Sequence, residues 1–164
     1  MNYTFISGAT GGIGKAFVCE CAKKGCALFL TGRSLDKLTA LKAEVQQKYA
    51  VEIEVFACML NDESSRKEMF DYIAQKDFKF DRIINVAGVD TQMAVECYTL
   101  DKLIFQMRVN VEGTITNTYS LLKHRADKVE VITVSSMSGV TPMPYFALYS
   151  ATKGCLTSFF SSLR

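Results

Sequence analysis

The sequence lacks several features that would assign it to a special class of protein. It has no dense run of lysine or arginine, and its net charge is only +2, so nothing indicates a nucleic-acid partner. No apolar run approaches the ~18 residues of a membrane span, so we expect no membrane partner. The N-terminus leads directly into a glycine cluster rather than a charged and then apolar leader. We therefore expect a cytoplasmic protein.

Metal-binding patterns are also missing. The chain has six cysteines but only one histidine, His124, and the cysteine spacing fits no common zinc motif. A disulfide framework is not expected in so apolar a chain. We interpret the cysteines as free and mostly buried thiols, and we expect no metal site.

What the sequence does contain is typical of a globular domain. Hydrophobic residues make up 49% of the 164 residues and charged residues 22%, so we expect one domain spanning residues 1–164. Short apolar runs alternate with stretches of helical periodicity. The predicted strands cover residues 3–7, 26–31, 51–56, 82–86 and 129–134.

Helix signals lie between those strands. A helix from about Ile13 ends at Gly25, Ser34 can cap a second helix, and Asn61 or Asp62 can cap a third. A long helix is expected over 101–124 and a last one from about residue 149. Repeated strand–helix units predict an α/β fold, a Rossmann-type doubly wound parallel sheet with helices on both faces. One face of the long helix is expected to be apolar and to consist of Leu103, Met107, Val111, Ile115 and Leu122.

A glycine-rich loop follows the first strand, with the sequence Ser-Gly-Ala-Thr-Gly-Gly-Ile-Gly over residues 7–14. Glycines at such a turn let the main chain approach a pyrophosphate, and the following helix offers free N–H groups to it. A plain tight turn is the alternative. The spacing resembles the cofactor loop of short-chain dehydrogenases/reductases. Gly8, Gly11 and Gly14 also fit the extended relatives that act on nucleotide sugars, so an epimerase-like protein stays open at this point.

The end of the second strand bears on the choice of cofactor. A Rossmann-type site reads the adenosine ribose there, and an acidic residue would repel a 2′-phosphate. Here Gly32 occupies that position and Arg33 follows it, and an arginine can bind a phosphate through two N–H groups. The resemblance therefore implies NADP rather than NAD, although the nearby Asp36 weakens the case.

Two middle segments resemble the family with a departure in each. Asn85-Val86-Ala87-Gly88 is similar to the family's N-N-A-G, with Val86 replacing the second asparagine. The family often has an aspartate near the adenine at the position of Met59. An apolar residue there removes one side-chain hydrogen bond to the cofactor.

The last part of the chain carries the sharpest motif. Tyr149 and Lys153 are four residues apart and share one face of a predicted helix. Ser136 lies thirteen residues before Tyr149 in a segment that resembles the family's S-S-x-x-G, and Asn110 matches the asparagine of its long helix. These matches, in the family's order, favour the short type over the extended one.

The resemblance implies a role for each residue. Tyr149 would act as general acid, Lys153 would stabilise its anion and bind the nicotinamide ribose, and Ser136 would hydrogen-bond the substrate oxygen. Asn110 would distort its helix and hold a water that relays protons towards Lys153. The implied cofactor-binding residues are Gly8, Thr10, Gly11, Gly12, Ile13, Gly14, Arg33, Ser34, Asn85, Ala87, Gly88, Tyr149 and Lys153.

The implied function is an NADP-dependent carbonyl reductase or alcohol dehydrogenase acting on a small-molecule ketone or secondary alcohol, in a homo-oligomer. The resemblance covers only the first part of the family's usual length, so we expect a chain that is incomplete at its C-terminus and lacks the last strands. A catalytically incomplete remnant that binds nucleotide or forms oligomers is the alternative. The substrate is not fixed by the sequence, although Tyr145 or Phe146 could line its site.

Overall fold

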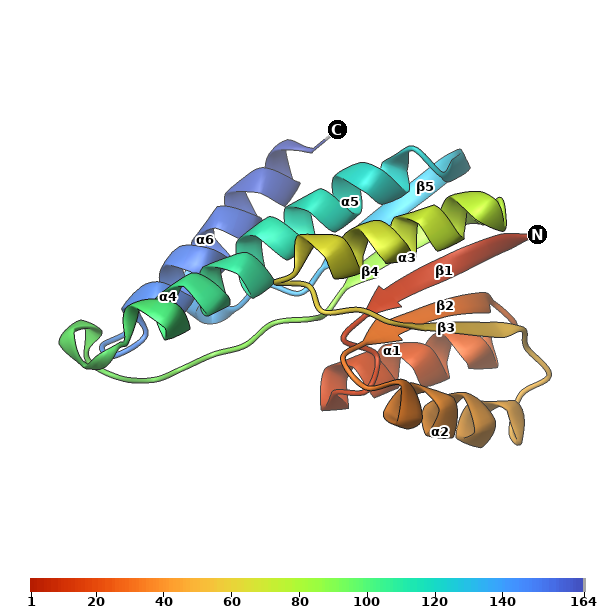
Figure 1. The fold of residues 1–164 in the computed structure, drawn as a ribbon, viewed down its shortest axis with the longest axis horizontal. Helices are drawn as coiled ribbons and strands as arrows, with labels where there is room; N and C mark the ends of the chain where they lie inside the picture. Colours follow the sequence, from red (N-terminus) through yellow and green to blue (C-terminus); the bar gives the residue numbers. More distant parts are fainter. Residues whose placement is uncertain (164) are drawn as a thin grey trace.

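The computed structural model describes residues 1–163, which form a parallel sheet with helices on both faces (Figure 1). The strand order is β3-β2-β1-β4-β5, and every neighbouring pair is parallel. The predicted Rossmann-type fold class is confirmed. The strands are β1 (Asn2–Ser7), β2 (Ala27–Gly32), β3 (Ile53–Ala57), β4 (Lys79–Asn85) and β5 (Arg125–Thr133).

The helices divide between the two faces of this sheet. In Figure 1, α1 and α2 lie below the strands, and α3, α5 and α6 lie above them. The helices are α1 (Gly12–Lys23), α2 (Leu35–Gln46), α3 (Glu63–Gln75), α4 (Leu100–Met107), α5 (Thr114–Leu122) and α6 (Ala147–Ser162), with a π-helical segment (Arg108–Gly113) between α4 and α5. None of the helices in residues 1–163 is long and apolar enough to cross a membrane.

Each face of the sheet has its own core. The layer between the sheet and helices α1 and α2 is aliphatic and includes Ile6, Val18, Leu30 and Leu38. The opposite layer is aromatic, because Phe5, Phe29 and Phe80 lie there with their ring centroids within 5.9 Å of one another. Strands buried on both faces read as continuous apolar runs, which is why the central strands were recognisable in the sequence.

Two strands begin earlier in the sequence than predicted. β4 begins at Lys79 rather than 82, and β5 begins at Arg125 rather than 129. The pairing of both strands is irregular between Phe80 and Arg82. Several positions in the first part of β5 are exposed and carry charge, so the apolar pattern that marks a strand is missing there.

The long helix differs more substantially. It runs from α4 to α5 but is interrupted by the π-helical segment, which contains Asn110. The expected apolar face is wrong: Met107 is exposed, and the other four residues of the predicted stripe are only partly buried. A π turn rotates the helical turns that follow it, so one 3.6-residue stripe cannot describe the whole helix, and its buried face is largely polar. Its buried polar members are Gln106, Asn110, Thr114, Asn117 and Thr118.

The predicted helix ends are found. Ser34 accepts a hydrogen bond from the main-chain N–H of Lys37, and Asp62 rather than Asn61 caps α3. Gly25 follows α1 with φ of 77°, as a glycine after a helix commonly does. All six cysteines are free, but the expectation of mostly buried thiols is wrong. Cys97, in a short turn before α4, and Cys155, on α6, are exposed, and Cys19 and Cys26 are only partly buried.

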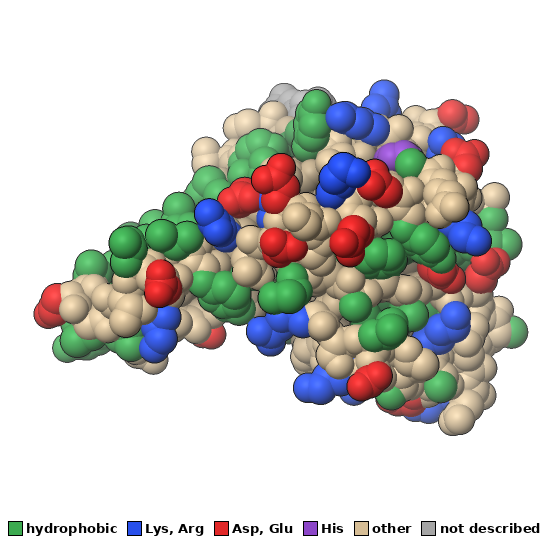
Figure 2. All heavy atoms as spheres, in the orientation of Figure 1, with side chains coloured by type: hydrophobic (Ala, Val, Ile, Leu, Met, Phe, Trp, Pro, Cys, Tyr) green, Lys and Arg blue, Asp and Glu red, His purple; other side chains and the backbone are tan. Residues whose placement is uncertain are grey.

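One end of the molecule projects beyond the sheet. Figure 1 shows that the start of α4 and the loops before α4 and α6 form it, and Figure 2 shows hydrophobic side chains gathered over it. The large exposed apolar residues of these segments are Val95, Leu100, Met137, Val140, Met143 and Tyr145.

The start of α1 generates a prediction about stability. A Cβ at Gly14 would lie 2.1 Å from the main-chain oxygen of Gly8, so Gly14→Ala should cost about 3 kcal/mol. The melting temperature should then fall by roughly 6–12 °C. Gly12→Ala is the matched control, because no atom lies within 4 Å of a Cβ there. Thermal unfolding followed by circular dichroism measures both, and equal melting temperatures would contradict this close approach.

Candidate active site

The glycine loop brings β1, β4 and α1 into close contact. Gly8 has φ of +64°, and a Cβ there would lie 2.8 Å from the main chain of Ala87. Only glycine fits this turn without strain. Helix α1 begins after Gly11 with no side-chain cap, which leaves its first main-chain N–H groups without intrahelical partners. Together with the positive end of the helix dipole, these N–H groups form a site suited to an anion.

A cavity of about 460 Å³ opens at the carboxyl ends of the strands, a size typical of small-molecule sites. Most of the predicted cofactor residues line it, namely Gly8, Thr10, Gly11, Gly12, Ile13, Gly14, Arg33, Ala87 and Gly88. Four others do not line it, namely Ser34, Asn85, Tyr149 and Lys153.

Ser34 and Asn85 have structural partners instead. The hydroxyl of Ser34 caps α2. The amide of Asn85 donates to the hydroxyls of Thr118 at 2.9 Å and Thr133 at 3.2 Å, and so ties β4 to α5 and β5. Both side chains therefore act behind the cavity wall.

The cavity has lining residues that the sequence analysis missed. Lys37, in the first turn of α2, lines it together with Arg33, so two cations face the end of β2. Cys58, Leu60 and Asn61 line the side near β3. Met59, expected near the adenine, is nearly half exposed and does not line the cavity. The only sequence signal for Lys37 was its place in the helix turn that follows Arg33.

Asn110 joins three elements at the far end of the cavity. Its side-chain oxygen accepts from the N–H of Val89 at 2.8 Å, and its amide donates to the carbonyl of Val89 at 2.8 Å. The same amide donates to the Thr152 hydroxyl at 3.1 Å, which connects the π-helical segment to α6. Asn110 is fully buried. The predicted local distortion of the helix at this residue is present as the π turn.

Lys153 lies beside this cluster. Its ammonium donates to the carbonyl of Val134 at 2.7 Å, and burial lowers the pKa of the Lys153 side chain. A Cβ at Gly88 would lie 3.5 Å from both the Asn110 side-chain oxygen and the Lys153 nitrogen. The nitrogen is 5.7 Å from the centroid of the Tyr149 ring. The side chains of Asn110 and Lys153 therefore meet at Gly88, three residues after the end of β4, and the Tyr149 ring lies near the Lys153 nitrogen.

Ser136 lies in the loop after β5 with its hydroxyl already oriented. Its oxygen accepts from the N–H of Ser138 at 3.2 Å and from the Ser138 hydroxyl at 2.9 Å. These bonds occupy the acceptor sites of Ser136 and leave its own proton free to donate. The loop is held against α6, because the Ser135 hydroxyl donates to the carbonyl of Lys153.

The chemistry available here follows from these groups. A phenol beside a desolvated ammonium, with a free hydroxyl donor on the next loop, can exchange a proton with a substrate oxygen. Among residues 1–163, no group of three or more histidine, cysteine or acidic side chains could hold a metal ion.

Comparisons with known proteins agree with this geometry. The family model described as short chain dehydrogenase matches residues 2–164. A very-long-chain 3-oxoacyl-CoA reductase of Vanderwaltozyma polyspora is 31% identical over 99% of this chain and 50% of its own length. An 11-beta-hydroxysteroid dehydrogenase-like protein of Arabidopsis thaliana is 30% identical, with 97% and 52% covered.

Solved structures share the fold. A short-chain dehydrogenase of Sphingobium yanoikuyae in complex with NADPH superposes with a TM-score of 0.90 at 19% identity, covering 99% of this chain and 64% of that one. The chain spans about half the length of the curated relatives it matches. Because the family model matches over residues 2–164, the chain belongs to the short-chain dehydrogenase family.

Proposed function

We propose that the protein is an NADP-dependent oxidoreductase that interconverts a ketone and a secondary alcohol. The observation that carries this proposal is the position of the buried Lys153 ammonium, which lies near the Tyr149 ring and against Gly88, a residue that lines a cavity beginning at an uncapped helix. The two relatives described above are named as a 3-oxoacyl-CoA reductase and a hydroxysteroid dehydrogenase-like protein. Both names describe carbonyl or alcohol chemistry.

The cavity has the features that a dinucleotide requires. The N–H groups at the start of α1 would hold the pyrophosphate. Arg33 and Lys37 would hold a 2′-phosphate, and Gly32 leaves no carboxylate there to repel it. Support for NADP over NAD comes from these two cations and from the NADPH bound to a structural neighbour. The nicotinamide, when bound, donates or accepts the hydride.

Side chains of the protein would transfer the proton to the substrate oxygen. Tyr149 donates its phenolic proton to the substrate oxygen during reduction, and the Lys153 ammonium stabilises the resulting phenolate. Ser136 donates its free proton to the same substrate oxygen, with Ser138 fixing its orientation. The side-chain amide of Asn110 is occupied by Val89 and Thr152. A relay water would therefore bind a main-chain carbonyl that the π turn leaves without an α-helical partner.

The substrate would be an apolar carbonyl compound or the matching alcohol. Phe146 packs near the Tyr149 ring, with centroids 6.0 Å apart, and the exposed Val140, Met143 and Tyr145 lie on the same loop. Apolar side chains beside the proton donor favour a substrate with apolar groups flanking its carbonyl. A cytoplasmic location and a homo-oligomeric state stay predictions.

Cofactor preference generates a prediction. NADPH should bind more tightly than NADH, and Arg33→Ala should weaken NADPH binding about tenfold or more through loss of a charge-assisted hydrogen bond. Lys37→Ala should have a smaller effect in the same direction, and neither variant should alter NADH binding. Titration followed by the fluorescence of the reduced nicotinamide measures this without tryptophan background, since the chain has none. Lys42→Ala, on the same helix but away from the cavity lining, is the control. Equal affinities for NADPH and NADH would contradict the NADP assignment.

Proton transfer generates another prediction. Tyr149→Phe should lower turnover by about 10²- to 10⁴-fold, the usual contribution of a general acid, while NADPH affinity stays nearly unchanged. NADPH oxidation with a panel of apolar ketones and 3-oxoacyl thioesters measures it. Tyr119→Phe, at an exposed site on α5, should behave like the wild type. Unchanged turnover in Tyr149→Phe would remove Tyr149 from this role. A wild-type chain that binds NADPH but reduces nothing would favour the non-catalytic alternative.

A further inference from the structure

Arg66 is a buried charged residue that the proposed mechanism does not use. It lies on α3 and is 5% exposed. Within residues 1–163, the only other charged side chain buried to this degree is Lys153. A buried guanidinium is costly unless acceptors surround it, so the partners of Arg66 indicate why it is there.

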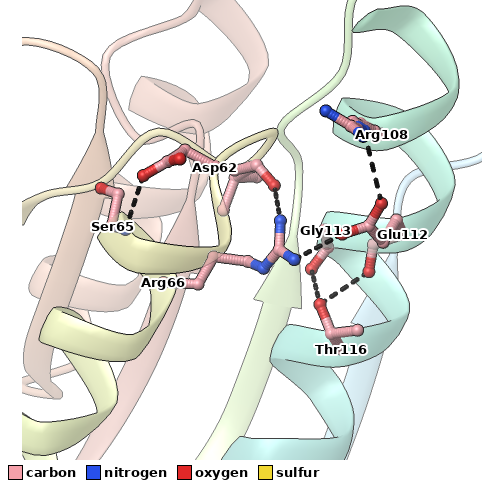
Figure 3. Close-up of polar contacts among 8 residues, drawn as sticks. Asp62, Ser65, Arg66, Arg108, Glu112, Gly113 and Thr116 are labelled. Atoms are coloured by element: carbon pink, nitrogen blue, oxygen red, sulfur yellow. Dashed lines mark hydrogen bonds and ion pairs between the residues drawn. The ribbon is translucent and has the colours of Figure 1, made fainter. Parts of the chain in front are cut away.

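The two arms of the guanidinium bind two different parts of the site (Figure 3). One nitrogen donates to the main-chain carbonyl of Leu60 at 2.5 Å, and another donates to the carboxylate of Glu112 at 2.5 Å. Leu60 lines the cavity beyond the end of β3. Glu112 belongs to the π-helical segment, two residues after Asn110. Arg66 therefore bridges the cavity wall and the segment that presents Asn110.

A second contact fixes the same spacing. A Cβ at Gly113 would lie 2.6 Å from the main-chain oxygen of Leu60 and 2.9 Å from its Cβ. Leu60 is thus enclosed between Gly113 and the Arg66 guanidinium. Leu60 therefore packs directly against the main chain of Gly113, and a side chain at position 113 would displace it.

The π-helical segment also holds the opposite wall of the cavity. Asn110 binds both main-chain groups of Val89, and Val89 lines the cavity at the end of β4. Both walls therefore depend on one short segment, through Asn110 on one side and through the Arg66–Glu112 pair on the other.

We infer that Arg66 is a positioning residue: it sets the place of Leu60 and Asn61 at the adenosine side of the cavity and couples that wall to the π-helical segment. The statement that a nucleotide binds against this wall rests on the proposed function. The planar fork of arginine suits two acceptors in different directions, whereas the point charge of lysine does not. Arg108 does not share this role, because it is exposed and lies 3.9 Å from the other Glu112 oxygen.

The test compares Arg66→Lys with three matched variants. Arg108→Gln removes the other cation near Glu112 without touching Leu60. Ile73→Val lowers the stability of the same helix at a fully buried site but leaves both bonds intact. Glu112→Gln keeps a hydrogen-bond acceptor for Arg66 and removes only the negative charge. It replaces Arg66→Lys as the test variant if Arg66→Lys fails to fold. Hydrogen exchange by mass spectrometry is measured on the chain alone over residues 58–61 and 108–113, and NADPH affinity by fluorescence.

The expected result is a rise of about tenfold in exchange in both segments of Arg66→Lys, with NADPH binding weakened to a similar extent, as for the loss of one charge-assisted hydrogen bond. Glu112→Gln should show a smaller rise in both segments. Arg108→Gln should show neither change, and Ile73→Val should leave NADPH binding unchanged and raise exchange in these two segments no more than in the rest of the chain. Faster exchange in only one segment, an equal effect of Arg108→Gln, or NADPH binding no weaker than in Ile73→Val would overturn the inference. If the wild-type chain binds no NADPH, the proposed function fails, and the exchange data alone decide the role of Arg66.

Discussion

The paired hydrogen bonds between the Asn110 side chain and the main chain of Val89 hold the candidate site together. Both bonds measure 2.8 Å, and the same amide reaches Thr152 on α6. A main-chain segment that leaves a sheet at a cavity edge has polar groups with no ladder partner, and leaving them unpaired would be costly. Asn110 supplies both partners from a helix that is distorted where the residue sits. Because α6 carries Tyr149 and Lys153, this side chain links the proton-transfer groups to the wall of the cavity at Val89.

The polar character of the buried helix face has an energetic consequence. Among the described residues, the amides of Gln106 and Asn117 have no hydrogen-bond partner although both side chains are buried. Lys153 is held where burial lowers its pKa, so its charged form is less favourable than in water. An apolar stripe at these positions would stabilise the fold more. Departures from the pattern that best stabilises a fold are expected at functional sites, and the buried Lys153 and Asn110 meet at Gly88, just after β4.

The sequence predicted what depends on local chemistry and missed what depends on distant contacts. The caps at Ser34 and Asp62 and the glycine loop follow from short motifs whose structure is set within a few residues, and the parallel α/β class follows from the alternation of strand and helix signals. The π turn was expected only as a distortion at Asn110, and the apolar face assigned to its helix was wrong, because periodicity assumes an unbroken helical repeat. Lys37 and Arg66 carry no motif at all. The partner of Arg66 that lies far along the chain, Glu112, becomes its neighbour only when α3 and the π-helical segment come together in the fold.

The place of the cavity is set by topology before any side chain is considered. In the order β3-β2-β1-β4-β5 the chain turns one way after β1 and the other way after β4, so the loops that follow these two strands diverge and leave a crevice at their carboxyl ends. Gly8 and Ala87 stand on the two sides of that crevice, and the missing side chain of Gly8 lets them touch. Such a crevice would accept many ligands, and many functions share this fold. Chemistry is therefore assigned by the side chains around the crevice: two cations after β2, Asn110 and Lys153 near the end of β4, and Ser136 after β5.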